Sequence, residues 1–430
     1  MNHAPTSKAV LWLLLSALSA GSMAFYVVRI WSANQPPHFN DFYAPWWGAH
    51  ELLLHRRNPY SRAVAHEIQS VIYGAPANAT SSDPANMAGG FAYPPYAALV
   101  VWPTLYMPFA DAQKILLALS VVAVLFSLIL WLHALRFRFS IIPWLTIALF
   151  VLGSFAALQG MKLENLSLIA AAFVALTIFA LSANHFVLAG IFLALSTFKP
   201  QFTIGLVLWL ALWIASDWRT RRPLAWSFLS TMLVLFLLSE RLIPGWIPQF
   251  FNVVRAYRQY TFGHSLFDVW FTPGWGSAFA TIFLIAALAL GWRHRLEPAS
   301  SLQFLTVTSL VLAVTLAVIP TLAPHAQLLL LPGFLCMLRG QPSLSQGRER
   351  LVLAATWVML GWPWIAAFGF LAASQWVSLP TLFKFWAVPL YTSPLLPLAV
   401  AATLGLLTTR FVLNTAPENS VSTSSQSLEL

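Results

Sequence analysis

Long apolar runs separated by short polar connections dominate the chain. A helix of about 20 apolar residues crosses a bilayer. Runs near this length occupy positions 9–30, 112–134, 141–158, 163–182, 186–198, 201–216, 224–242, 277–292, 300–319, 326–338, 351–371 and 388–408. Several are short, so their helices must be tilted or broken. The pattern predicts an all-α membrane protein with about twelve crossings and both termini on one side of the membrane.

The first run resembles a signal peptide because Lys8 precedes it. The run is long, however, and no clear cleavage site with small residues follows it, so we interpret it as the first transmembrane helix.

Short basic connections indicate which side is cytoplasmic. If the N-terminus is inside, the inner connections carry Arg136, Arg138, Arg219, Arg221, Arg222, Arg293, Arg295, Arg339, Arg348 and Arg350. Compact loops rich in Arg and Lys stay in the cytoplasm. We therefore expect a multi-pass protein with both termini cytoplasmic.

The long segments 31–111, 243–276 and 372–387 then face outward. The first of these segments is polar, and its many prolines indicate an irregular structure. It ends in an apolar stretch, 93–109, that prolines interrupt, and we interpret this stretch as re-entrant or interfacial. We expect one transmembrane domain over residues 1–413 and a disordered cytoplasmic tail, rich in Ser and Thr, over 414–430.

Composition supports a lipid environment. Hydrophobic residues make up 59% of the chain and charged residues 8%, whereas soluble domains carry about 25% charged residues. The net charge of +10 is dispersed among apolar runs, which favours topology signals and functional sites over nucleic-acid binding. The single cysteine, Cys336, allows no disulfide within the chain.

Two polar residues at predicted outer helix ends are candidates for chemistry. Asp41 follows the first helix in the segment HFNDFYAPWW, whose aromatic residues would hold it against the membrane interface. Partial burial raises a carboxyl pKa and suits a general base, although a solvated loop carboxylate or a helix cap fits the same position. Lys199, in STFKPQF, stands at a break between two runs. It could bind a lipid phosphate or simply extend toward the interface.

Other outer polar residues have weaker signals. His325, between two prolines and an apolar run, could donate to a phosphate or orient a sugar hydroxyl. Gln159 and Asn165 belong to a polar turn between two runs, which is also how an ordinary hairpin connection would look. Arg255 and Arg258 are one helical turn apart and either bind a phosphate or lie on an amphipathic surface helix.

Familiar nucleotide and hydrolase signatures are absent from the sequence, including the Walker A loop, GxGxxG, HExxH and GxSxG. The candidate groups face outward, where nucleotide sugars are not normally available. An outward-facing transferase must therefore take its sugar from a lipid carrier.

The order of five segments resembles a known family. These segments are NDFYAPWWGAHELLLHRRNPYS, FAYPPYAALVVWPTLYMPF, LQGMKLENLSLI, LAGIFLALSTFKPQF and APHAQLLLLPGFL, which span about residues 25–340. They are similar to the polyprenol-phosphate-mannose-dependent α-mannosyltransferases, glycosyltransferase family 87 of the GT-C superfamily. The resemblance implies a bacterial inner-membrane protein with a GT-C helical bundle and a site built by outer loops.

The resemblance also implies roles for residues. Asp41 would be the general base, and the family's Lys-Pro and His positions map onto Lys199 and His325, which would bind the donor phosphate. Apart from the resemblance, the residues themselves suggest Arg255 and Arg258 as further donor-phosphate ligands. Tyr43, Tyr93, Gln159, Asn165 and Gln201, which lie in or beside the matching segments, would contact substrate. The chain departs from the family's Gly-Gln-x-Asn pattern, because it has Gln159–Gly160 with Asn165 further on.

The expected reaction is an inverting transfer of mannose from a polyprenyl-phosphate carrier to an acceptor hydroxyl. The acceptor could be a glycolipid, a polysaccharide, a protein or a lipid-linked glycan. No cofactor or metal is required, although a carboxylate and a phosphate could hold a divalent ion between them. Two alternatives remain open: a donor carrying arabinose, glucose or galactose, and a non-enzymatic lipid-linked-sugar transporter, which would place charges in mid-helix and often show inverted repeats.

Overall fold

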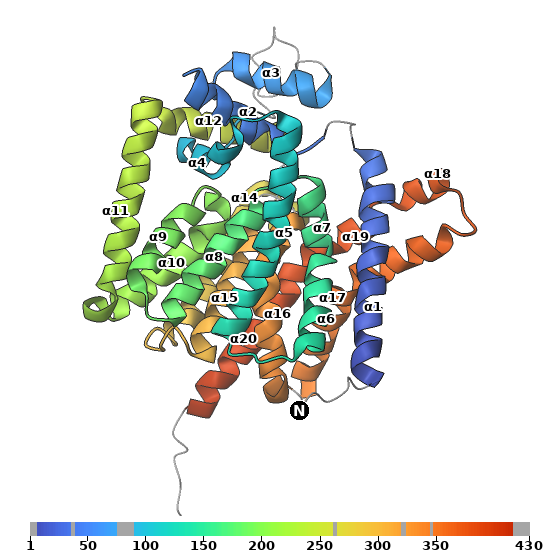
Figure 1. Cartoon of the computed structure of the whole chain (residues 1–430). Coiled ribbons are helices and arrows are strands. Elements are labelled where there is room, and N and C mark those ends of the chain that lie inside the picture. Colours follow the sequence, from blue (N-terminus) through green and yellow to red (C-terminus); the bar gives the residue numbers. More distant parts are fainter. Residues whose placement is uncertain are drawn as a thin grey trace, which may run out of the picture.

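The computed structural model describes residues 7–35, 39–74, 90–260, 265–319, 324–344 and 347–415. Within these ranges every regular element is helical and no strand is formed, so the predicted all-α class is confirmed (Figure 1). The predicted tail lies almost entirely outside the described residues.

Six helical segments are long and apolar enough to cross a membrane. They correspond to α1 (Ser7–Phe25) continued by a π-helical turn to Trp31, α5 (Phe109–Ala134), α11 (Trp218–Leu242), α14 (Pro273–Trp292), α17 (Gly347–Ala373), and a region from Leu379 to Phe411 that includes α18 (Leu379–Leu382), α19 (Val388–Thr392) and most of α20 (Leu396–Thr415). A seventh span is possible if α6 (Ile141–Leu152) and α7 (Phe155–Lys162), which meet at 54°, count as one.

The remaining predicted runs also fall on helices, but on shorter ones. These are α8 (Ser167–Ser182), α9 (Phe186–Ser196), α10 (Pro200–Ser216), α15 (Leu302–Val318), and the pair formed by a 3₁₀ segment (Pro324–Leu330) and α16 (Leu331–Gly340). Length and composition alone therefore support six or seven spans, and twelve crossings remain a prediction.

Helix α15 forms the centre of the bundle. It is buried on all sides from Phe304 to Ala317, as expected of a helix that is apolar all round. It packs against α10, α14, α16 and α20. Elsewhere in the bundle a glycine allows a close helix contact: a Cβ at Gly190 on α9 would lie 2.7 Å from the carbonyl oxygen of Leu224 on α11.

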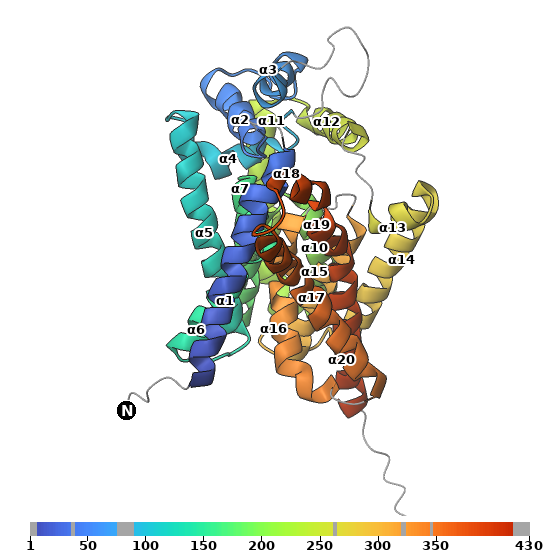
Figure 2. The same cartoon turned by 90° about the vertical axis from the view of Figure 1, so that its right-hand side faces the viewer.

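One end of the bundle carries a layer of helices that lie across it (Figures 1 and 2). This layer contains α2 (Tyr43–Leu54), α3 (Arg62–Tyr73), α4 (Ala98–Val101) and α12 (Trp246–Tyr260). The α1 residues nearest the N-terminus and the last turns of α20 lie at the opposite end, as do the basic connections between α5 and α6 and between α10 and α11. This arrangement agrees with both termini lying on one side.

The prediction that segment 31–111 is irregular was wrong for much of its length. Helices α2 and α3 form in this segment, and local caps satisfy both ends of α3: the Ser61 hydroxyl accepts from the N–H of Val64, and Gly74 ends the helix with a left-handed φ of 79°. Between positions 93 and 109 only short helical pieces form before α5. None reaches a spanning length, and the choice between re-entrant and interfacial remains a prediction.

Candidate active site

Asp41 lies in the connection that enters α2. The capping group of α2 is its neighbour Asn40, whose Oδ1 accepts from the N–H of Phe42 at 3.1 Å and of Tyr43 at 2.7 Å. The Asp41 carboxylate is thus left to other partners. Its backbone N–H donates to the carbonyl of Leu163 at 2.7 Å, which fixes this connection to the turn between α7 and α8.

Asn165 joins Asp41 to Lys199. The Asn165 amide Nδ2 donates to Asp41 Oδ2 at 2.6 Å, and the Lys199 ammonium donates to Asn165 Oδ1 at 2.5 Å. Ser167 adds a further contact, because its Oγ accepts from Lys199 at 2.9 Å and donates to Asn165 Oδ1 at 2.5 Å. Four side chains from three distant parts of the sequence therefore form one network, which we call the Asp41–Asn165–Lys199 cluster.

Two chain reversals place the cluster. After α7, Glu164 adopts a left-handed φ of 56°, and the N–H of Asn165 donates back to the carbonyl of Gly160 at 2.8 Å. The second reversal is the break between α9 and α10, where Pro200 occupies the first turn of α10 and Lys199 precedes it. Because Lys199 stands outside both helices, its side chain is free to reach Asn165.

Aromatic residues cover the Lys199 side of the cluster. The ammonium lies 5.6 Å from the ring centre of Tyr93 and 5.4 Å from that of Phe202, within the range of cation–π attraction. The hydroxyl of Tyr96 donates to the carbonyl of Thr197 at 3.0 Å, so the 93–96 segment is fixed against the break. Lys199 is consequently buried, with 4% of its surface exposed.

Burial shifts the two charged groups in opposite directions. It raises the pKa of Asp41, while the hydrogen bond from Asn165 and the charge of Lys199 oppose the rise. It lowers the pKa of Lys199 to about 7, and the Asp41 charge opposes the fall. The carboxylate is thus a stronger base, and the ammonium a stronger acid, than the same groups in water.

Two tyrosines respond to the Asp41 charge. Desolvation first, and then the charge of the Asp41 carboxylate, raises the pKa of Tyr93 and of Tyr257; the desolvation of Tyr257 is partial, because 37% of its surface is exposed. Both phenols therefore remain protonated at physiological pH and keep an O–H to donate. Tyr257 comes from α12, so this surface helix passes near the cluster.

His325 and Gln159 contribute buried polar atoms without partners. His325 Nδ1 and Gln159 Oε1 have no hydrogen-bond partner among the described residues, and the elements that carry them, the 3₁₀ segment 324–330 and α7, pack together. Burial first, and then the Lys199 charge, lowers the pKa of His325 to about 3, so its imidazole is neutral. Such unsatisfied buried groups are uncommon, and a water molecule or a bound ligand beside the cluster could complete them.

Other predicted site residues lie in different surroundings. Arg258 lies 3.7 Å from the carboxylate of Asp268 on α13 (Leu266–Trp270), and Arg255 is exposed on the same helix, α12. Tyr43 is buried among Trp46, Trp47 and Phe109. Gln201 is exposed in the first turn of α10.

Sequence reasoning missed Ser167 and Tyr257. Ser167 had one usable signal, its position two residues after Asn165 in a turn where short polar side chains bond to one another. Tyr257 sits between the two arginines that drew attention on α12, and nothing in the sequence pointed to its nearness to Asp41.

Comparison with known families gives one match. The sequence model of glycosyltransferase family 87 matches residues 91–339, more than half of the chain. The matched region includes Asn165, Lys199 and His325, whereas Asp41 lies before it. A search of curated proteins found no match.

Proposed function

Because the chain belongs to glycosyltransferase family 87, and is thus a membrane glycosyltransferase, we propose that it transfers a mannosyl group from a polyprenyl-phosphate carrier to an acceptor hydroxyl at the outer membrane face. The observation that carries the proposal is the Asp41–Asn165–Lys199 cluster, in which one amide holds a base and a cation side by side. A displacement at an anomeric carbon needs both groups, one for the entering hydroxyl and one for the leaving phosphate.

Asp41 acts as the general base. Its carboxylate takes the proton of the acceptor hydroxyl while the acceptor oxygen forms a bond to the anomeric carbon of the sugar. Its raised pKa suits this role, because a base that operates near neutral pH works best with a pKa closer to that pH. The residue is half-buried in the connection that enters α2, so one side remains accessible to an acceptor.

Lys199 stabilises the leaving group. As the bond from the anomeric carbon to the phosphate oxygen breaks, its electron pair goes to the phosphate, and the buried ammonium neutralises the growing charge. His325 is neutral and therefore acts as a hydrogen-bond partner rather than as a second cation. A single displacement inverts the configuration, so a β-linked donor yields an α-mannoside.

The position of Asp41 in the fold supports an active site that faces the outer side of the membrane. Asp41 immediately precedes α2 in the layer at one end of the bundle, opposite the first residues of α1 and the last turns of α20. That end is extracytoplasmic if the basic connections are cytoplasmic. The lipid-linked donor would then reach the site from the membrane, with its phosphate at the break between α9 and α10.

The Asp41→Asn variant tests the base. Asparagine keeps the oxygen that accepts from Asn165, so the variant should fold, yet it cannot take a proton. We expect turnover to fall about 100-fold or more, within the range of general base catalysis. The assay is release of polyprenyl phosphate from polyprenyl-phosphate mannose, together with formation of a new glycoside, by purified protein in the presence of bacterial membrane lipids.

Asp111→Asn is the matched control, because Asp111 is an exposed carboxylate in the first turn of α5 whose partner is Lys114. Near-normal turnover by Asp41→Asn would remove the base assignment. A panel of donors carrying mannose, glucose, galactose or arabinose tests the sugar, and preference for another sugar would overturn the mannosyl assignment alone. Sugar movement across the membrane with the donor bond intact would overturn the transferase proposal.

A further inference from the structure

The C-terminal end of α2 gathers three residues that can bind a metal. Ligand atoms of His50, Glu51 and His55 all lie within 4.8 Å of one another. We propose that these three residues bind a divalent transition metal ion, for which Zn²⁺ is the best match. Two imidazole nitrogens and one carboxylate oxygen are a ligand set that Zn²⁺ commonly takes, whereas Mg²⁺ and Ca²⁺ prefer oxygen ligands alone.

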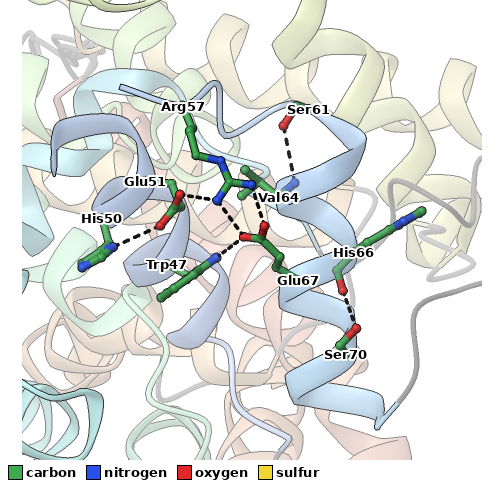
Figure 3. Close-up of polar contacts among 9 residues, drawn as sticks. All are labelled: Trp47, His50, Glu51, Arg57, Ser61, Val64, His66, Glu67 and Ser70. Atoms are coloured by element: carbon green, nitrogen blue, oxygen red, sulfur yellow. Dashed lines mark hydrogen bonds and ion pairs between the residues drawn. The ribbon is translucent and has the colours of Figure 1, made fainter. Parts of the chain in front are cut away.

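Neighbouring side chains fix the position of the Glu51 carboxylate (Figure 3). Its side chain is 3% exposed, and the Arg57 guanidinium donates to its Oε2 at 2.6 Å. The same guanidinium pairs with Glu67 on α3 at 2.5 Å, and Trp47 Nε1 donates to Glu67 at 2.9 Å. Because one carboxylate oxygen is anchored, the other keeps a fixed direction. Such support around a ligand is typical of metal sites.

The second oxygen of Glu51 is only weakly engaged. Its Oε1 lies 3.3 Å from His50 Nδ1, at the long end of the hydrogen-bond range. A buried carboxylate normally has stronger partners on both oxygens. A metal ion between this oxygen and an imidazole would supply one.

Both imidazoles are positioned at the helix end. The His50 ring stacks on Trp47 with centres 5.1 Å apart and 9° between planes, and it also contacts Trp46. His55 follows the last residue of α2, and its ring centre is 5.1 Å from that of His50. The carbonyl groups at a helix C-terminus carry partial negative charge, which favours a cation there.

The net charge of the side chains beside the proposed site also favours a bound cation. Glu51 and Glu67 are two carboxylates that share the single guanidinium of Arg57. These three side chains together have one net negative charge, which attracts a cation. Three protein ligands would leave a coordination position for water, as in many zinc sites.

The proposed site is separate from the Asp41–Asn165–Lys199 cluster. Asp41 precedes the N-terminus of α2, whereas the proposed ligands lie in its last two turns and just after it; the rise from Tyr43 to His50 alone is about 10 Å. The ion would therefore connect the end of α2 to the Arg57–Glu67 contact on α3. Its effect would be to stabilise the layer that carries Asp41, without taking part in the reaction.

Metal titration of the purified full-length protein, prepared without a histidine tag and treated with a chelator, tests the proposal. Zn²⁺ affinity is measured by competition with a fluorescent chelator, and Co²⁺ is used as a spectroscopic probe of nitrogen and oxygen ligands. We expect one Zn²⁺ per chain. The His55→Ala and His50→Ala variants should each bind about 100-fold more weakly or worse, since even the loss of a supporting contact costs about 10- to 100-fold.

His66→Gln is the matched control, because His66 lies on α3 and points away from His50 and Glu51 (Figure 3). It should bind Zn²⁺ like the wild type. Zn²⁺ should also raise the thermal unfolding temperature of the wild type and of His66→Gln, but not of His55→Ala. Because His55 is exposed, its replacement should leave the fold intact, so misfolding would not account for a loss of binding. Absence of Zn²⁺ binding to the wild type, or equal binding by His55→Ala, would overturn the proposal.

Discussion

Replacement of Asn165 by leucine should disable the enzyme while leaving it folded. Leucine is similar in size and suits a position that is 5% exposed, but it can neither donate to Asp41 nor accept from Lys199. Each of these hydrogen bonds involves a charged group and is worth about 1.5–3 kcal/mol. The two together correspond to about 10²- to 10⁴-fold, and because Asp41 is only half-buried we expect the lower end, about a 100-fold fall in kcat/KM.

The pH profile distinguishes this effect from a general loss of structure. The Asn165 hydrogen bond lowers the pKa of Asp41, so its removal raises that pKa and keeps the carboxyl protonated to a higher pH. The acid limb of the kcat/KM profile should therefore move to higher pH in Asn165→Leu. The control is Gln113→Leu, because Gln113 donates at 2.8 Å to Glu164 in the same turn without touching Asp41. An acid limb that stays in place, or the same loss in the control, would refute the reasoning.

The remaining predictions concern Lys199 and helix packing. Because burial lowers the pKa of Lys199 to about 7, the side chain loses its charge progressively as pH rises through that value. The kcat/KM for the polyprenyl-phosphate donor should therefore fall over the same range. Lys199→Arg should move this alkaline limb to higher pH, and an unchanged limb would show that another group causes it. Gly190→Ala should lower the thermal unfolding temperature in detergent, since the added methyl group would meet the Leu224 carbonyl and Ser227 on α11, at a cost of about 1–3 kcal/mol. Gly361→Ala, whose methyl group meets nothing within 4 Å, is its control, and equal unfolding temperatures would contradict the packing argument.

The helical fold followed from the sequence because a bilayer imposes simple rules. Apolar length and basic connections depend on local composition, and each predicted run lies on one or more helical elements of the structure. The layer formed by α2, α3, α4 and α12 at one end of the bundle was harder to foresee. Helices α2 and α3 depend on caps such as Asn40 and Ser61 and on contacts to other elements, and the abundance of proline between positions 31 and 111 obscured them.

The family was predictable, and the match to glycosyltransferase family 87 confirms it. The geometry of the site was only partly predictable from the sequence. Asp41 and Lys199 were selected because each stands at a helix end, a local property. Their connection through Asn165 depends on two separate chain reversals meeting in space, which no spacing rule predicts. The pairing of Arg258 with Asp268 arises in the same way, from a contact between α12 and α13.

The opposed pKa shifts in the cluster give the proposed reaction an order. Burial favours the neutral forms of both Asp41 and Lys199, so in the absence of substrate each is held closer to neutrality than in water. A donor phosphate beside Lys199 would favour the charged ammonium, because an opposite charge stabilises it. The charged ammonium would in turn lower the pKa of Asp41 and favour the carboxylate. Binding of the donor would thus prepare the proposed base before the acceptor hydroxyl arrives, which would give the amide that joins Asp41 and Lys199 a role in the proposed reaction.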